Sequence, residues 1–135
     1  KGFELAGILA IELFITKDNK VIVNELAPRP HNSGHYTIEA CSFDQFDAHI
    51  RGIAGWPLEQ PQLLKPAVMV NVLGQHVAPT RALIADHPEW NVHDYCKAEV
   101  RHDRKMGHIT VLTDDTAKTV ADLEATGCWD DLKKA

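Results

Sequence analysis

The chain has 135 residues, of which 44% are hydrophobic and 24% charged, which is enough for one globular domain with a real core or for one piece of a larger one. Its formal net charge of −5, with no basic stripe to offset it, argues against nucleic acid as a partner. No apolar run approaches the roughly 20 residues that a membrane span needs, and three widely spaced cysteines indicate free thiols in a reducing compartment.

The first elements along the chain are two predicted strands, residues 7–15 and 21–26, each an apolar run with few charges. The polar turn sequence at 17–20 lies between them, so the pair predicts a β-hairpin with Asp18-Asn19 as its two-residue loop. That loop sets a register in which Ile15 lies opposite Ile22, Leu13 opposite Asn24, and Glu12 opposite Glu25.

The predicted pairing of Glu12 with Glu25 brings two carboxylates to within about 5 Å at their Cβ atoms. Like charges so placed destabilise a sheet unless a cation lies between them, and a hard divalent ion such as Mg²⁺ would remove the conflict. The alternative is an exposed strand edge where both side chains diverge into water. In this register Asn24 lies on the opposite face from Glu25.

A dense polar run, from Arg29 to His35, follows the second strand. Two prolines make the backbone stiff and extended there, so the strand cannot continue directly as helix. Arginine offers a bidentate fork for phosphate or carboxylate, and histidine and asparagine make directional hydrogen bonds. A helix beginning at Ser33-Gly34 would add free N–H groups that favour an anion.

The remaining pattern predicts an α+β fold, with a mostly antiparallel sheet covered by helices. We expect helix over 33–55, capped by Ser33 or Thr37 and ended by Gly55, with a break near Cys41 after which Ser42-Phe43-Asp44-Gln45 starts a second helix. The other predicted elements are strands at 67–73, 91–97 and 105–113, a helix at 80–86 capped by Thr80, and a helix from Asp114-Asp115-Thr116 to about Ala125.

A second cationic group comprises four residues in nine positions: Lys97, Arg101, Arg104 and Lys105. In an acidic chain such a cluster predicts a focused anion pocket, although a solvated surface run is the alternative. No Ser-His-Asp arrangement accompanies either polar cluster, so covalent catalysis is unsupported.

Several of these motifs occur together in one known family. They are Val23 to His35 (Val-Asn-Glu-Leu-Ala-Pro-Arg-Pro-His-Asn-Ser-Gly-His), Gln45-Phe46 with Arg51, Pro57-Leu58, the strand before Gly74, Arg104 to Ile109 (Arg-Lys-Met-Gly-His-Ile), and Gly127-Cys128-Trp129. With them the chain resembles the C-terminal part of 5-(carboxyamino)imidazole ribonucleotide synthases, which are ATP-grasp carboxylases (ligases) of bacterial purine biosynthesis.

The resemblance implies roles for individual residues. Glu12 and Glu25 match magnesium ligands that hold ATP phosphates, and Asn24-Glu25 is a segment that contacts ATP. Three residues match catalytic positions near the bicarbonate and the aminoimidazole ribonucleotide: Arg29, His31 and Asn32. Two match the cations that bind the ribonucleotide's phosphate: Lys97 and Arg104.

The implied reaction is phosphoryl transfer from ATP to bicarbonate, followed by carboxylation of the ribonucleotide's exocyclic amine. The implied cofactors are ATP and Mg²⁺, the implied location is cytoplasmic, and the full-length enzyme is expected to be a homodimer. Residues 1–60 would be the end of the ATP-grasp domain and 61–135 a small C-terminal, β-rich domain. The front portion that supplies the other ATP contacts is not in this sequence, so we expect an inactive fragment.

Two departures from the family pattern occur near the second cluster. His102-Asp103 stand where a Pro-Gly type of turn is usual, and Cys96 stands where glycine usually precedes the lysine. Asp103 would add an anion beside the phosphate pocket. Two other functions remain open: an ATP-grasp glycinamide ribonucleotide formyltransferase fragment, and a non-catalytic nucleotide-binding domain.

Overall fold

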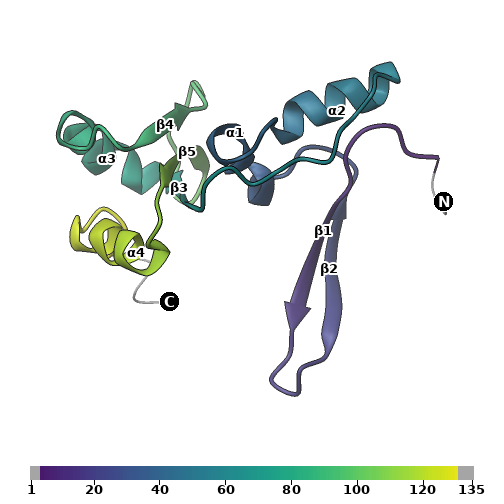
Figure 1. Cartoon of the computed structure of the whole chain (residues 1–135). Coiled ribbons are helices and arrows are strands. Elements are labelled where there is room, and N and C mark those ends of the chain that lie inside the picture. Colours follow the sequence, from purple (N-terminus) through teal and green to yellow (C-terminus); the bar gives the residue numbers. More distant parts are fainter. Residues whose placement is uncertain (1–3, 131–135) are drawn as a thin grey trace. The chain divides into compact units, whose positions relative to one another are not determined.

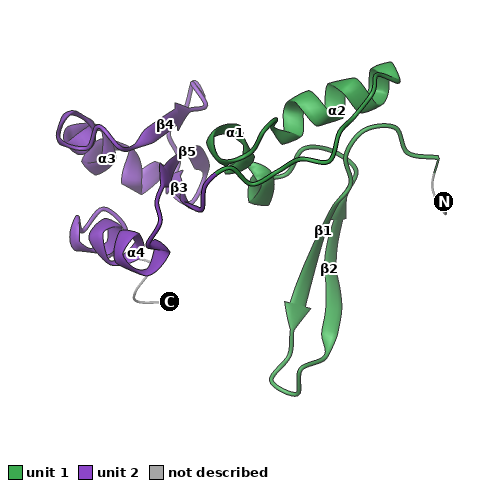
Figure 2. Ribbon diagram, in the orientation of Figure 1, with its two compact units in different colours: residues 1–64 green, residues 65–135 purple. Residues whose placement is uncertain are grey.

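The computed structural model describes residues 4–130, which form two compact units divided between Leu64 and Lys65 (Figure 2). The first unit contains β1 (Ala10–Ile15), β2 (Val21–Ala27), the 3-10 helix η1 (Asn32–Gly34), α1 (Thr37–Ala40) and α2 (Gln45–Ala54) (Figure 1). The second contains β3 (Ala67–Leu73), η2 (Gly74–His76), α3 (Val77–Leu83), η3 (Ile84–Asp86), β4 (Asn91–Asp94), β5 (Lys105–Leu112) and α4 (Thr116–Ala125).

The described residues confirm the predicted α+β class, because every strand pair is antiparallel and the helices are separate from the sheets. The assignment of residues 1–60 to the end of an ATP-grasp domain and of residues 61–135 to a small C-terminal domain stays a prediction. No helix within residues 4–130 is long and apolar enough to cross a membrane.

The hairpin β1–β2 closes with a three-residue loop, so the predicted two-residue loop Asp18-Asn19 is wrong. The Thr16 amide donates to the Lys20 carbonyl at 2.9 Å, and Asn19 has φ +58°. A left-handed last residue is what a three-residue loop needs, and asparagine adopts that conformation more readily than most residues. The pairs next to the loop shift by one residue: Ile15 lies opposite Val21 instead of Ile22, and Leu13 opposite Val23 instead of Asn24.

A β-bulge then restores the predicted register further along the hairpin. Leu13 pairs with Val23 but Glu12 pairs with Glu25, so Asn24 is the extra residue on β2. The predicted opposition of Glu12 and Glu25 is therefore confirmed, although by a loop and a bulge that compensate each other.

Both faces of the hairpin carry apolar side chains that are at least half exposed within the described structure. An apolar, β-branched run such as Val21 to Val23 is typical of a buried or half-buried strand, so this exposure departs from the sequence pattern. Six of these side chains are those of Ile11 (52% exposed), Leu13 (52%), Phe14 (58%), Ile15 (75%), Val21 (62%) and Val23 (57%).

The predicted helix over 33–55 is three short helices with a break at Cys41–Asp44, where the prediction had allowed one. Neither Ser33 nor Thr37 caps the first of these helices. Asp44, in the segment expected to start a second helix, caps α2: its carboxylate accepts from the backbone N–H groups of Phe46 (2.7 Å) and Asp47 (2.9 Å). The helix ends as predicted at Gly55, which has φ +67°.

The second unit is a three-stranded sheet in the order β3-β5-β4, with its core on β3, β5 and α4. Ile109 is fully buried in the central strand, and the Trp129 indole donates to the Asn71 carbonyl at 3.0 Å. Asp115 caps α4 as predicted. Thr80 does not cap α3 but lies inside it, because Pro79 is tolerated in the first turn of a helix that begins at Val77.

Candidate functional site

The glutamate pair lies near the end of the hairpin opposite the loop, and it is the centre of the first candidate site. Glu12 and Glu25 are direct cross-strand partners. Their side chains are 37% and 49% exposed, so they are neither buried nor fully solvated. Two carboxylates held side by side in this way repel each other unless a cation or hydrogen-bond donors lie between them.

Asn24 supplies such a donor, because the bulge brings it to the same side as Glu12. Its Nδ2 donates to Oε2 of Glu12 at 3.1 Å. The prediction that Asn24 lies on the opposite face from Glu25 is therefore wrong. Strict alternation fails at a bulge, where two successive residues of one strand oppose a single residue of the other.

The imidazole of His31 is the third member of the group. Its Nδ1 lies 3.5 Å from Oε1 of Glu12, its Nε2 lies 3.9 Å from Oε1 of Glu25, and the side chain is only 11% exposed. The hydroxyl and backbone amide of Ser33 lie 2.9 and 3.4 Å from Nδ1. One ligand atom from each of Glu12, Glu25 and His31 lies within 4.8 Å of the other two.

The donor set of this cluster fits a divalent cation. Two carboxylates offer the hard oxygen ligands that Mg²⁺ prefers, and Mg²⁺ usually takes one or two carboxylates and completes its shell with water and phosphate. Glu12 and Glu25 are the residues that would hold it. The exposed fraction of both side chains leaves room for a phosphate on the open side.

The other two polar residues predicted here follow β2: Arg29 lies in the loop, and Asn32 begins η1. Arg29 is 61% exposed; its Nη2 is 3.9 Å from Oε1 of Glu25, and its Nη1 donates to the Pro30 carbonyl at 3.0 Å. Asn32 has a buried side-chain oxygen with no hydrogen-bond partner among residues 4–130. A buried acceptor left unpaired is costly, so this oxygen is suited to accept from a ligand's N–H group.

In the second unit, Lys97 and Arg104 come from the loop between β4 and β5, and Lys97 lies beyond the strand in which it was expected. Lys97 Nζ donates to the Lys105 carbonyl at 2.6 Å and lies 5.4 Å from the centre of the Tyr95 ring. Arg104 donates to the Glu99 carbonyl at 3.2 Å. Both cations therefore use backbone acceptors, and within residues 4–130 neither has a carboxylate partner, whereas Arg101 is paired with the Glu99 side chain.

Lys97 lies over the ring of Tyr95, and Tyr95 is in turn paired with His108. No role next to Lys97 was predicted from the sequence for either residue. The Tyr95 hydroxyl lies 2.9 Å from Nδ1 of His108, and His108 is only 2% exposed and stacks on His93 at 4.4 Å between ring centres. Burial raises the pKa of the Tyr95 hydroxyl. The signal in the sequence was a histidine inside an apolar strand.

The two departures from the family pattern coincide with strained backbone. Cys96 has φ +50° and Asp103 has φ +59°, a region where glycine carries no steric penalty. The Asp103 carboxylate accepts from the Gln75 amide at 3.1 Å and lies 3.1 Å from Nδ1 of His102. The carboxylate of Asp103, the extra anion in this loop, thus already has Gln75 and His102 as partners.

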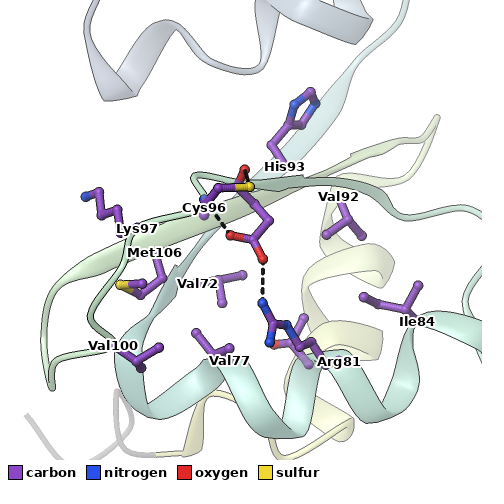
Figure 3. Close-up of a pocket in the computed structure, with 13 residues that line it drawn as sticks. Val72, Val77, Arg81, Ile84, Val92, His93, Cys96, Lys97, Val100 and Met106 are labelled. Atoms are coloured by element: carbon purple, nitrogen blue, oxygen red, sulfur yellow. Dashed lines mark hydrogen bonds and ion pairs between the residues drawn. The ribbon is translucent and has the colours of Figure 1, made fainter.

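A cavity of about 140 Å³ lies beside this loop (Figure 3). Aliphatic side chains from β3, α3 and β4 surround it together with Met106 of β5, and Lys97 lies at its margin. Arg81 pairs with Asp94 at 2.6 Å on its polar side. The hydrogen bond from Arg81, helped by the Cys96 amide, holds the pKa of Asp94 below its usual value.

The comparisons with known proteins agree with the motifs. Residues 1–46 match the ATP-grasp domain family, and residues 67–122 match the phosphoribosylaminoimidazole carboxylase C-terminal domain family. An N5-carboxyaminoimidazole ribonucleotide synthase of Staphylococcus saprophyticus is 52% identical over 120 residues, which are 88% of this chain and 32% of the relative.

Solved structures give the same result. The Staphylococcus aureus N5-carboxyaminoimidazole synthetase complexed with ADP superposes with a TM-score of 0.87 at 48% identity, covering 91% of this chain and 33% of the other. An Aspergillus clavatus synthase in complex with ADP and 5-aminoimidazole ribonucleotide has a TM-score of 0.78 at 33% identity, and the match covers 89% of this chain and 34% of the other.

The chain thus spans about a third of the length of the curated relatives that it matches. Both of its units are accounted for by the two matched families, and its polar motifs lie inside or between the matched residues. The chain therefore matches about a third of the length of the ATP-grasp N5-carboxyaminoimidazole ribonucleotide synthases, with a piece of the ATP-grasp domain followed by the phosphoribosylaminoimidazole carboxylase C-terminal domain.

Proposed function

We propose that the protein containing this chain carboxylates 5-aminoimidazole ribonucleotide with bicarbonate at the expense of ATP, in purine biosynthesis. The observation that carries the proposal is the cross-strand pair Glu12 and Glu25, with Asn24 hydrogen-bonded to Glu12. A carboxylate pair on a bulged hairpin, inside a region that matches the ATP-grasp domain, suits a metal–nucleotide site.

The first step is transfer of the γ-phosphoryl group of ATP to a bicarbonate oxygen, which gives ADP and carboxyphosphate. Mg²⁺ bound by Glu12 and Glu25 would neutralise charge that develops on the phosphates. Asn24 orients the Glu12 carboxylate and contributes to the ATP contact. Arg29, 61% exposed beside Glu25, is available to bind bicarbonate through its guanidinium fork.

The second step is attack by the exocyclic amine of the ribonucleotide on the carboxyl carbon, with loss of phosphate and of one amine proton. The unpaired, buried oxygen of Asn32 is a suitable acceptor for that amine N–H, and His31 lies next to it in the chain. Lys97 and Arg104, which have no carboxylate partner among the described residues, bind the ribonucleotide's phosphate. By likeness to the family we further propose a cytoplasmic homodimer.

The test is ADP release by the full encoded protein with magnesium, bicarbonate and aminoimidazole ribonucleotide. We expect release that needs the ribonucleotide and is lost in Glu25→Gln, while glycinamide ribonucleotide with formate gives none. Release with glycinamide ribonucleotide and formate instead would favour the formyltransferase. No release with either substrate would leave a non-catalytic nucleotide-binding domain.

A further inference from the structure

Gln45, the first residue of α2, has a polar side chain that is buried, with only 7% of the residue exposed. Its backbone is fixed on both sides. Asp44 caps the helix immediately before it, and the Gln45 amide N–H donates to Oγ1 of Thr37 at 3.0 Å. The start of α2 is therefore a rigid platform from which the Gln45 side chain projects.

The carboxamide of Gln45 hydrogen-bonds to both backbone groups of His31. Its Oε1 accepts from the His31 backbone N–H at 2.8 Å, and its Nε2 donates to the His31 carbonyl at 2.9 Å. The same Nε2 lies 2.8 Å from Nδ1 of His35. One side chain thus satisfies both backbone groups of His31 and reaches the second histidine of the loop, using its acceptor and both of its donor hydrogens.

Gly34 makes this close approach possible. A Cβ atom at position 34 would lie 2.4 Å from Oε1 and 2.8 Å from Cδ of Gln45. The loop from His31 to His35 is therefore packed directly onto the carboxamide, and the buried amide has little room to move aside.

The hydrogen bonds of Gln45 reach the loop but not the carboxylates on the hairpin. Glu12 and Glu25 are held by strand pairing, whereas His31 and Asn32 depend on the loop that the Gln45 side chain fixes. Loss of the carboxamide should therefore disturb the loop residues, His31 among them, while strand pairing keeps Glu12 and Glu25 opposite each other.

We propose that Gln45 is a positioning residue that keeps His31 and Asn32 in register with the reacting groups, and so couples ATP hydrolysis to carboxylation. The inference rests on the function proposed above. If the amine is misaligned, carboxyphosphate decomposes to CO₂ and phosphate before attack, and ADP is released without carboxylated product. A displacement of about 1 Å is enough to cost about 100-fold in rate at a reacting centre.

The experiment compares Gln45→Glu with Gln60→Glu in the full encoded protein. Both changes replace one carboxamide with a carboxylate, but Gln60 is exposed. In Gln45→Glu the donor to the His31 carbonyl becomes an acceptor, so we expect carboxylated product per ADP to fall by about tenfold or more. The KM for ATP should stay within about twofold, and Gln60→Glu should match the wild type in both measurements.

Gly34→Ala tests the same contact from the other side, because its methyl group would displace the carboxamide. It should lower product per ADP as Gln45→Glu does, and the double variant should be no worse than the poorer single variant. Unchanged product per ADP in Gln45→Glu would overturn the positioning role alone; unfolded protein releases neither ADP nor product, so a general loss of stability cannot lower this ratio. A wild-type protein with no ribonucleotide-dependent ADP release would instead overturn the proposed function, and this inference with it.

Discussion

Asn24 donates a hydrogen bond to Glu12 across the hairpin, with 3.1 Å between Nδ2 and Oε2. The donor exists on that side only because Asn24 is the extra residue of a β-bulge. The bulge therefore places three polar side chains together, Glu12, Glu25 and Asn24, where a regular ladder would have placed two.

Asn24→Ala should weaken metal binding without removing a ligand. A group that orients a metal ligand typically contributes about 10- to 100-fold to metal affinity or activity. We expect the magnesium concentration for half-maximal ADP release by the full encoded protein to rise by about tenfold. Asn19→Gly, in the hairpin loop, is the control, and an unchanged magnesium dependence in Asn24→Ala would refute the orienting role.

Glu25→Gln should have opposite effects on activity and on the stability of the metal-free protein. It removes one of two facing like charges, which are destabilising in a strand pair by about 0.2 to 1 kcal/mol. Denaturant unfolding in excess chelator should therefore show equal or greater stability, while ribonucleotide-dependent ADP release is lost. A variant that is both inactive and clearly less stable without metal would indicate that the carboxylates do not repel each other in this fold.

Cys96→Gly should stabilise the protein, because Cys96 has φ +50°. A left-handed conformation costs an ordinary L-residue about 1 to 2 kcal/mol, and glycine avoids this cost. Part of the gain is lost because glycine has more conformational entropy in the unfolded chain. The Cys96 backbone N–H, which donates to Asp94 at 2.8 Å, is kept in the variant. We expect a gain of up to about 1 kcal/mol in denaturant unfolding, and a loss of stability would show that the thiol itself makes a net contribution.

Arg81→Gln should destabilise the protein at neutral pH but not in strong acid. Arg81 lowers the pKa of Asp94 in the folded state, so the unfolded chain binds more protons between the folded and unfolded pKa values. The contribution is thus complete above about pH 4 and is lost as the pH falls through the folded pKa. Both side chains are largely exposed, 64% and 43%, so the difference at pH 7 should be at most about 1 kcal/mol. An equal difference at pH 7 and pH 2.5 would exclude the ion pair as its source.

Local signals predicted some elements well. Gly55 and Asp115 mark helix ends by mechanisms that act within a few residues, and both were correct. The pairing of Glu12 with Glu25 was also correct, but two errors cancelled. The left-handed Asn19 and the bulge at Asn24 each shift the register by one residue, and neither can be read from hydrophobic alternation.

Long-range contacts explain what the sequence did not reveal. In the sequence Gln45 is an ordinary polar residue at the start of a helix. Its hydrogen bonds go to His31, fourteen positions earlier, and no local pattern predicts them. The break at Cys41 was predicted, but the pairing of Cys41 with Leu63 that accompanies it was not. Thr80 has the chemistry of a helix cap, yet the helix starts earlier because Pro79 fits its first turn. The roles of Glu12, Glu25, Arg29, His31, Asn32, Lys97 and Arg104 stay predictions.

The exposed apolar side chains on both faces of the hairpin have a consequence for biogenesis. A two-stranded ribbon in water is marginally stable at best, and one with faces such as those of Phe14 and Val21 gains its stability only when other protein covers it. The carboxylate pair is carried by this ribbon, so the protein that covers the ribbon also determines how firmly the two carboxylates are held. A nascent chain or proteolytic remnant with an uncovered ribbon would expose a surface that chaperones and proteases recognise, and would be removed before it could consume ATP.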